Sequence, residues 1–205
     1  MEKISYNIIQ KALNKKLPGE RYHKYMWPAG KKRIYRDTFS PAATLLLIYL
    51  HEGELYFPLI RRSNREDDHH RGQISLPGGH KENNESLVET ALRETEEEIG
   101  VKIFIDEIAG ILTPLPIPHS GFIVYPSVAY TERSLQYSPD PKEVEEIIHV
   151  RLIELFEHPE NRFFHLENGL RVPGFLFSNV NVWGATAMIL NEFKALKNRF
   201  HKNSL

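Results

Sequence analysis

Apolar positions along the chain follow two different periods. Near the N-terminus they recur at helical spacing until Pro18 and Gly19, which predicts a short amphipathic helix that ends there. Residues 42–50 and 55–61 are β-branched, aromatic and apolar, and the polar residues 51–54 separate them. This composition and this loop length predict a β-hairpin.

The middle of the chain predicts a helix between extended segments. Helical periodicity covers residues 86–99, and extended runs cover residues 101–112 and 122–130. The proline-rich residues 113–118 between those two runs predict a loop. Residues 147–152 are a further strand candidate.

The C-terminal third predicts two strands around an Asn168-Gly169 turn, followed by a helix. The strands fall at residues 163–166 and 170–172, and the helix falls at residues 186–200. Internal repeats and low-complexity segments are absent from the sequence. The pattern as a whole therefore predicts an α/β fold in which helices flank a sheet.

The composition is that of a globular protein with one large domain or two small ones. The chain has 205 residues, of which 41% are hydrophobic and 26% are charged. Its longest apolar run, residues 43–50, is far shorter than the roughly 20 residues that cross a bilayer, and no secretion segment follows Met1. We therefore expect a soluble, cytoplasmic protein without a membrane partner.

Cysteine is absent, which excludes several kinds of chemistry. A chain without cysteine has no disulfide, no thiolate nucleophile and no zinc finger. Any metal chemistry must therefore use carboxylate or histidine ligands.

Charge is distributed unevenly along the chain. Residues 1–36 hold ten Lys and Arg against two Glu, whereas the rest holds 16 Lys and Arg against 25 Asp and Glu. A basic segment can bind nucleic acid or an anionic ligand, but a solvated helix face explains the same charges. We assign no nucleic-acid partner to it.

Residues 86–99 carry strong helix signals. Ser86 and Glu89 stand at the spacing of a capping box, and Gly100 stands where a helix ends. One apolar stripe predicts the buried face of this helix and consists of Val88, Ala91, Leu92, Thr95 and Ile99. We expect Thr95 to pack in this stripe through its methyl group.

The opposite face of this helix is acidic. Glu94, Glu97 and Glu98 follow at i, i+3 and i+4, where like charges repel by a few tenths of a kcal/mol per pair. A hard divalent cation such as Mg²⁺ or Mn²⁺ offsets that repulsion, because it prefers oxygen ligands and bridges to phosphate oxygens. A helix face that is simply exposed to solvent is the alternative interpretation.

Two neighbouring features favour the metal site. The segment Leu76-Pro77-Gly78-Gly79 precedes the helix, and glycine lets the backbone approach a ligand with a carbonyl free to coordinate. Glu85, Glu89 and Arg93 follow at four-residue intervals. We expect these two carboxylates to hold the Arg93 guanidinium beside the acidic face.

These residues resemble the Nudix box. Gly79, Glu85 and the run Arg93-Glu94-Thr95-Glu96-Glu97-Glu98-Ile99-Gly100-Val101 stand at the family's spacing, and Thr95 replaces the usual aliphatic residue. The resemblance implies an α/β/α sandwich around a mixed β-sheet. It also implies a diphosphatase that hydrolyses a nucleoside diphosphate linked to another group, with Mg²⁺ or Mn²⁺ as cofactor.

The resemblance also assigns roles to individual residues. The implied metal ligands are Glu94, Glu97, Glu98 and the carbonyl of Gly79. Glu85 and Arg93 would orient this cluster, and with Glu97 they are our catalytic candidates.

Water is the expected nucleophile. Cations neutralise the charge that develops as a diphosphate bond breaks, and they lower the pKa of bound water. A general base is also required, and the candidates are Glu97, Glu143, Glu145 and Glu146.

A longer part of the chain, residues 40–195, resembles the coenzyme A diphosphatases within this family. The similarity includes residues 59–63 and 70–79, the group's acidic loop at residues 140–146, and residues 182–190, which resemble the group's C-terminal helix. It implies that coenzyme A or acyl-CoA is cut to 3′,5′-ADP and 4′-phosphopantetheine or its acyl form.

The substrate side chains follow from the same similarity. A 3′-phosphate needs cations, and the candidates are Arg61, Arg62, His70 and Arg71, although a solvated loop explains the same residues. Two departures bear on this assignment. The stretch between Ser63 and Gly72 is one residue longer than the group's pattern, and Asp68 stands near a usual arginine.

Other functions stay open at this point. A Nudix hydrolase can act on ADP-ribose, a nucleotide sugar or a dinucleoside polyphosphate, and a Nudix module can bind a nucleotide without cutting it. The complete carboxylate set argues against the second alternative. We divide the chain into a basic N-terminal extension with an accessory helix, residues 1–36, and a Nudix hydrolase domain, residues 37–205. Nudix relatives are often homodimers, so a homodimer is a candidate state.

Overall fold

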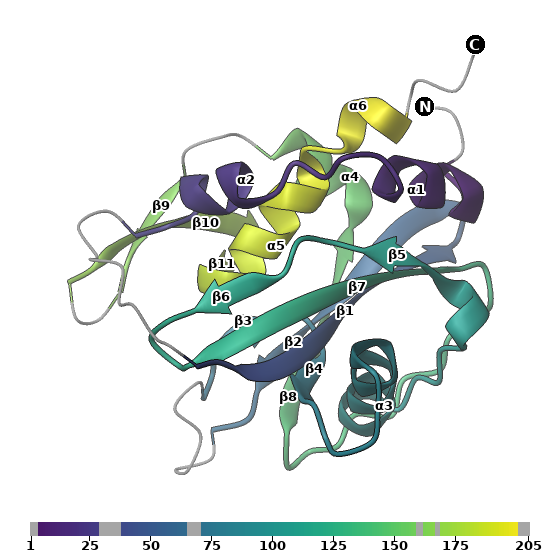
Figure 1. Cartoon of the computed structure of the whole chain (residues 1–205), viewed down its shortest axis with the longest axis horizontal. Coiled ribbons are helices and arrows are strands. Elements are labelled where there is room, and N and C mark those ends of the chain that lie inside the picture. The colour runs from purple at the N-terminus through teal and green to yellow at the C-terminus, as the bar shows by residue number, and fades with distance from the viewer. Residues whose placement is uncertain (1–3, 29–37, 65–70, 159–161, 167–168, 201–205) are drawn as a thin grey trace.

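The computed structural model describes residues 4–28, 38–64, 71–158, 162–166 and 169–200. A mixed β-sheet forms its centre, and helices cover both faces of that sheet (Figure 1). The expected α/β sandwich with helices ahead of it is confirmed.

The main sheet is organised around one long strand, β1 (Ser40–His51). One edge of β1 pairs in parallel with β7 (Phe122–Thr131). Its other edge pairs with antiparallel β4 (Gly78–His80) in the first half and β2 (Glu54–Arg62) in the second half. Further strands of this sheet are β3 (Ile74–Ser75), β5 (Ile108–Ile111), β6 (Leu115–Ile117) and β8 (Val144–Arg151). A smaller sheet contains β9 (Phe163–His165), β10 (Arg171–Phe177) and β11 (Val180–Trp183).

β1 is apolar at almost every position because both faces of the sheet are buried. Leu45 and Leu47 pack in the core beneath α3 (Leu87–Ile99), whereas Leu46 and Ile48 pack in the core of the opposite face. The helices on that opposite side are α1 (Tyr6–Leu13), α2 (Glu20–Tyr25), α4 (Leu152–Glu157), α5 (Gly184–Lys194) and α6 (Lys197–Phe200). No helix in the described part of the chain is long and apolar enough to span a bilayer.

The structure corrects several element boundaries. Of the extended run 101–112, only β5 is a strand, because a 3₁₀ turn at Ile105–Glu107 precedes it. The proline-rich segment is not a loop throughout, since β6 pairs with β7 there. Pro116 is tolerated in β6 because the strand adds to the sheet as a short edge segment, where a missing N–H costs little. The C-terminal helix 186–200 is divided into α5 and α6.

A buried carboxylate attaches the N-terminal helices to the rest of the molecule. Glu192 of α5 is fully buried and accepts hydrogen bonds from His23 Nε2 at 2.9 Å and Gly19 N at 3.0 Å. It also accepts the Thr113 hydroxyl at 2.6 Å and the Thr113 N–H at 3.2 Å. Burial works to raise the pKa of Glu192, but the hydrogen bonds from His23 and Thr113 outweigh it and lower that pKa.

The Glu192 carboxylate should contribute to folding in a pH-dependent way. Because its pKa is lowered in the folded state, the contribution is complete above the ordinary glutamate pKa of about 4.3 and is lost as pH falls below it. Glu192→Ala should cost about 3 kcal/mol at pH 7, since buried His23 and partly buried Gly19 and Thr113 all lose their acceptor. Urea unfolding between about pH 3 and 7 measures the free energy of unfolding and so tests both effects.

Glu157→Ala is the matched control, because Glu157 is an exposed carboxylate at the end of α4. A Glu192→Ala variant whose free energy of unfolding equals that of the Glu157→Ala variant at every pH would contradict the assignment.

Candidate active site

α3 begins and ends as its sequence predicts. The Ser86 hydroxyl accepts the Glu89 N–H at 3.2 Å, and the Glu89 carboxylate accepts the Ser86 N–H at 2.6 Å. Gly100 ends the helix in the left-handed conformation, with φ of 70°. The capping box occupies Glu89, so the expectation that Glu89 also holds Arg93 is wrong.

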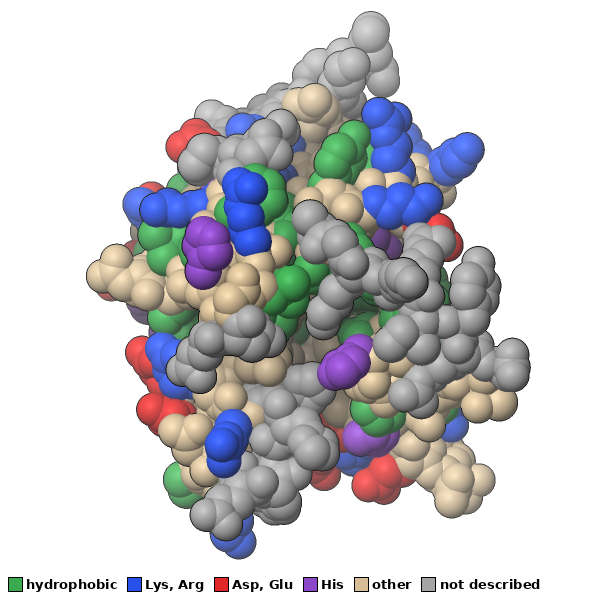
Figure 2. All heavy atoms as spheres, turned by 90° about the vertical axis from the view of Figure 1, so that its left-hand side faces the viewer, with side chains coloured by type: hydrophobic (Ala, Val, Ile, Leu, Met, Phe, Trp, Pro, Cys, Tyr) green, Lys and Arg blue, Asp and Glu red, His purple; other side chains and the backbone are tan. Residues whose placement is uncertain are grey.

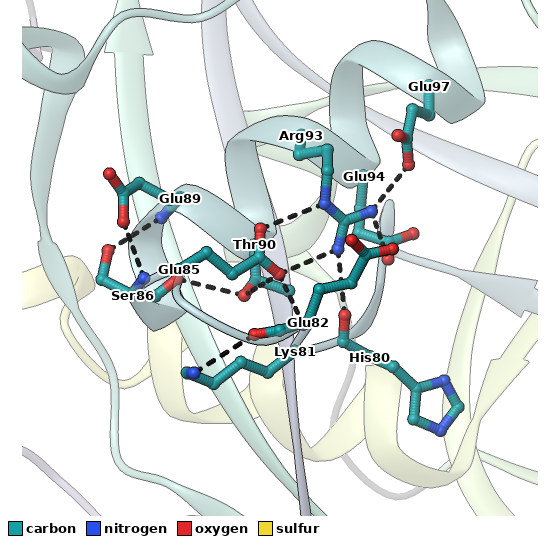
Figure 3. A network of polar contacts seen from close by, with 10 residues as sticks. All are labelled: His80, Lys81, Glu82, Glu85, Ser86, Glu89, Thr90, Arg93, Glu94 and Glu97. Carbon is teal, nitrogen blue, oxygen red and sulfur yellow. Dashed lines mark hydrogen bonds and ion pairs between the residues drawn. The ribbon is translucent and has the colours of Figure 1, made fainter.

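Arg93 is the centre of a polar network on α3 (Figure 3). Its Nε and Nη2 donate to the two carboxylate oxygens of Glu85 at 3.1 and 3.0 Å, the paired geometry typical of arginine and carboxylate. Its Nη1 donates to Glu94 at 2.9 Å and to Glu97 at 2.7 Å. Nη2 also donates to the His80 carbonyl at 3.0 Å. The structure thus brings Glu85, Arg93, Glu94 and Glu97 together.

The same network fixes the charge of Glu85. The Arg93 guanidinium lowers the pKa of Glu85 to about 2, with additional hydrogen bonds from the Glu82 N–H and the Thr90 hydroxyl. Glu85 is therefore ionised at every pH at which the protein would be assayed. Its carboxylate joins the turn before α3 to the middle of the helix.

Glu98 points into the protein rather than along an exposed ridge. Its side chain is 2% exposed, accepts the Gly78 N–H at 2.9 Å, and lies 3.5 Å from the Arg62 guanidinium. Burial raises the pKa of Glu98 to about 8, and the neighbouring Glu94 and Glu143 carboxylates add to the rise. The two partners only partly offset the cost of burying this carboxylate.

Glu94 lies against the glycine turn. A Cβ atom on Gly79 would stand 2.5 Å from the Glu94 carboxylate, so only glycine leaves this space free. Burial raises the pKa of Glu94 also, although Arg93 acts to lower it. Glu97 differs from both, because its side chain is 55% exposed.

The three glutamates therefore occupy different environments. Among the described residues, no group of three His, Asp or Glu side chains is gathered closely enough to hold a metal ion as it stands. The chemistry of the donors nevertheless fits a hard cation. Glu98 is buried and Glu94 is partly buried, the two carboxylates repel each other, and positive charge between them would relieve both burial and repulsion.

The glutamates of the later acidic run, residues 143–146, have different partners. Glu143 acts electrostatically on both Glu94 and Glu98, which places it beside the buried carboxylates. Glu146 instead forms an ion pair with Arg61 at 3.1 Å. Of the general-base candidates that the sequence offers, Glu97 and Glu143 are thus associated with the acidic cluster.

A pocket of about 670 Å³ is lined in part by Arg61 of strand β2. Its lining residues are Arg61, Arg71, Gly72, Gln73, Ile74, Leu166, Asn179, Val180, Asn181 and Trp183. Figure 2 shows the side of the molecule that lies at the left in Figure 1, where Lys, Arg and His side chains are scattered around a hollowed centre.

The basic side chains that the sequence singles out are placed differently from one another. Arg61 and Arg71 both line the pocket, whereas Arg62 is directed to Glu98. His70 lies outside the described residues. Sequence reasoning missed Asn179, Asn181 and Trp183, although the alternation in Val180-Asn181-Val182-Trp183 is a strand signal that also marks which residues share a face.

Gly79→Ala should displace the Glu94 carboxylate, because the new Cβ would occupy its position. We expect the affinity for Mn²⁺ to fall about tenfold or more, the usual effect of disturbing the surroundings of a metal ligand. Calorimetric titration with Mn²⁺ measures this, with Asn83→Ala on the exposed preceding turn as control. Equal Mn²⁺ affinity in the two variants would contradict the role of Gly79.

Comparison with known proteins identifies the family of this chain. The NUDIX domain family model matches residues 39–168. The mitochondrial coenzyme A diphosphatase NUDT8 of Mus musculus is 30% identical over 177 residues, covering 83% of this chain and 84% of that protein. The Homo sapiens protein of the same name is 33% identical over 170 residues, covering 78% of this chain and 71% of that protein.

A solved structure agrees on the fold. The crystal structure of a MutT/nudix family protein from Enterococcus faecalis superposes with a TM-score of 0.53 at 19% identity, covering 93% of this chain and 72% of that one. With the family model matched over the residues that carry the Arg93 network, the chain belongs to the Nudix family and is a diphosphatase of the Nudix hydrolases.

Proposed function

We propose that this Nudix hydrolase cleaves the diphosphate of coenzyme A or an acyl-CoA, giving 3′,5′-ADP and 4′-phosphopantetheine or its acyl form. One observation carries the proposal. Two adjacent residues of β2 have different surroundings: Arg61 lines the pocket, and Arg62 pairs with buried Glu98. Arg61 and Arg71 give this pocket cationic groups suited to a phosphate, and the strand that supplies Arg61 also supplies Arg62 to the acidic cluster. The two relatives named as coenzyme A diphosphatases support the same substrate.

The residues that would hold Mg²⁺ or Mn²⁺ are Glu94, Glu97, Glu98 and the Gly79 carbonyl. When bound, such a cation supplies a Lewis acid that neutralises charge on a diphosphate. Arg93 would keep the Glu97 carboxylate in place until substrate arrives, since it binds Glu85 and Glu97 at the same time. Glu97 or Glu143 would accept the proton of the attacking water, because each is a carboxylate associated with the cluster.

The pocket also bears on the alternative substrates. ADP-ribose, a nucleotide sugar and a dinucleoside polyphosphate share the diphosphate but lack a 3′-phosphate for Arg61 and Arg71. A module that only binds nucleotides would not need buried Glu98 beside partly buried Glu94, because the desolvation of both carboxylates costs stability. Both considerations favour a coenzyme A hydrolase.

The candidate substrates can be ranked by their kcat/KM values. Purified protein with Mn²⁺ is expected to hydrolyse coenzyme A with a higher kcat/KM than ADP-ribose or NADH, because only coenzyme A carries a 3′-phosphate for the two pocket arginines. Product analysis by liquid chromatography measures this and identifies 3′,5′-ADP. Rapid turnover of ADP-ribose with no turnover of coenzyme A would refute the proposal that coenzyme A is the substrate.

Glu98→Gln should abolish most activity without unfolding the protein. The amide is nearly isosteric and uncharged, so it removes a buried carboxylate whose burial is costly, and we expect the melting temperature to be kept or raised. We expect kcat to fall by about 100-fold or more, because a carboxylate that contacts the reacting centre is lost. Glu96→Gln, on the exposed side of the same helix, is the control. Near-normal kcat in Glu98→Gln would count against the mechanism.

A further inference from the structure

One wall of the pocket lies beyond the part of the chain that matches the Nudix family. The family match ends at residue 168, whereas Asn179, Val180, Asn181 and Trp183 belong to the hairpin formed by β10 and β11. This wall therefore lies outside the matched region that carries the Arg93 network. A wall at that distance from the acidic cluster is expected to act on substrate preference rather than on bond cleavage.

The hairpin turn holds Asn179 in a costly conformation. Phe177 pairs with Val180, so Ser178 and Asn179 form a two-residue turn, and their φ angles are 44° and 68°. Both values lie in the left-handed region, which such a turn requires but which residues other than glycine rarely adopt. Asparagine tolerates this conformation better than most residues, and here its side chain lines the pocket.

Alternation along β11 directs Val182 into the core and its two neighbours away from it. Val182 is fully buried in the core, so Asn181 and Trp183 lie on the opposite face, and both line the pocket. The Thr186 hydroxyl at the start of α5 donates to the Ile74 carbonyl of β3 at 3.3 Å. This bond fixes the end of the hairpin to the strand that forms the facing wall.

The two walls differ in chemistry. The β2–β3 side contributes the guanidinium groups of Arg61 and Arg71, whereas the hairpin contributes two carboxamides and an indole. A ligand that suits both walls has an anionic phosphate at one end and a neutral, amide-containing chain at the other. Carboxamide side chains match secondary amides, because each provides both a donor and an acceptor.

We propose that the β10–β11 hairpin binds the amide-containing pantetheine arm of the substrate, with Asn179 and Asn181 bonding its amides and Trp183 covering its apolar part. This inference rests on the proposed function and adds to it the residues that set substrate preference. The hairpin holds substrate equally in the ground and transition states, so it acts on KM rather than on kcat.

Two variants remove the amides without disturbing the fold. Asn181→Ala shortens an exposed side chain within β11, and Asn179→Gly deletes the side chain while keeping a residue that adopts positive φ readily. Each should raise KM for coenzyme A and for dephospho-coenzyme A about tenfold, the scale of one lost hydrogen bond, with kcat unchanged. KM for ADP-ribose, which has no such arm, should not change. Asn83→Ala, on an exposed turn before α3, is the control.

Binding of pantetheine provides a readout that does not depend on turnover. Titration of free pantetheine into the wild-type protein and into Asn181→Ala should show an affinity about tenfold lower in the variant. An equal rise in KM for ADP-ribose would overturn the inference, because the hairpin would then bind the part that all these substrates share. Unchanged KM for coenzyme A in both variants would overturn it while leaving the proposed function in place. A wild-type protein that does not hydrolyse coenzyme A would contradict both.

Discussion

The site depends on a carboxylate that is held inside the protein. Glu98 is almost fully buried, and its carboxyl group is met by one backbone N–H from the glycine turn and one arginine from β2. Burying a charge is costly unless its partners are fixed, so α3, the glycine turn and β2 must keep their relative positions. The apolar packing of β1 beneath α3 provides that rigidity, since β1 also pairs with β4 and β2.

Much of this arrangement was predictable because its signals are local. The capping box, the left-handed Gly100 and the Glu85–Arg93 pair follow from spacing within a few residues, and the structure contains all three. The hairpin of β1 and β2 follows from apolar composition and loop length in the same way. The sequence resemblance added the family, which no local rule supplies.

The parts that were not predictable depend on contacts between distant segments. The i, i+3, i+4 spacing places three glutamates on one side of a helix, but the rotation of α3 against the sheet decides that Glu98 is buried and Glu97 exposed. Spacing also does not show which of two possible partners a side chain binds. Glu89 stands at a suitable spacing for both Ser86 and Arg93, and it caps the helix instead of binding Arg93. The hairpin wall of the pocket is more than 100 residues from Arg61 along the chain, so only the fold reveals it.

The pairing of β2 with β8 has an evolutionary consequence. The register shifts between Arg61 and Arg62, so that Arg61 faces Glu146 and Arg62 faces Val144. Neighbouring residues of a strand point to opposite faces, and here one is directed towards the pocket and the other towards the acidic cluster. Inserting or deleting a single residue here would exchange their environments together. Descendants of this protein can therefore diversify through the hairpin far more freely than through this strand.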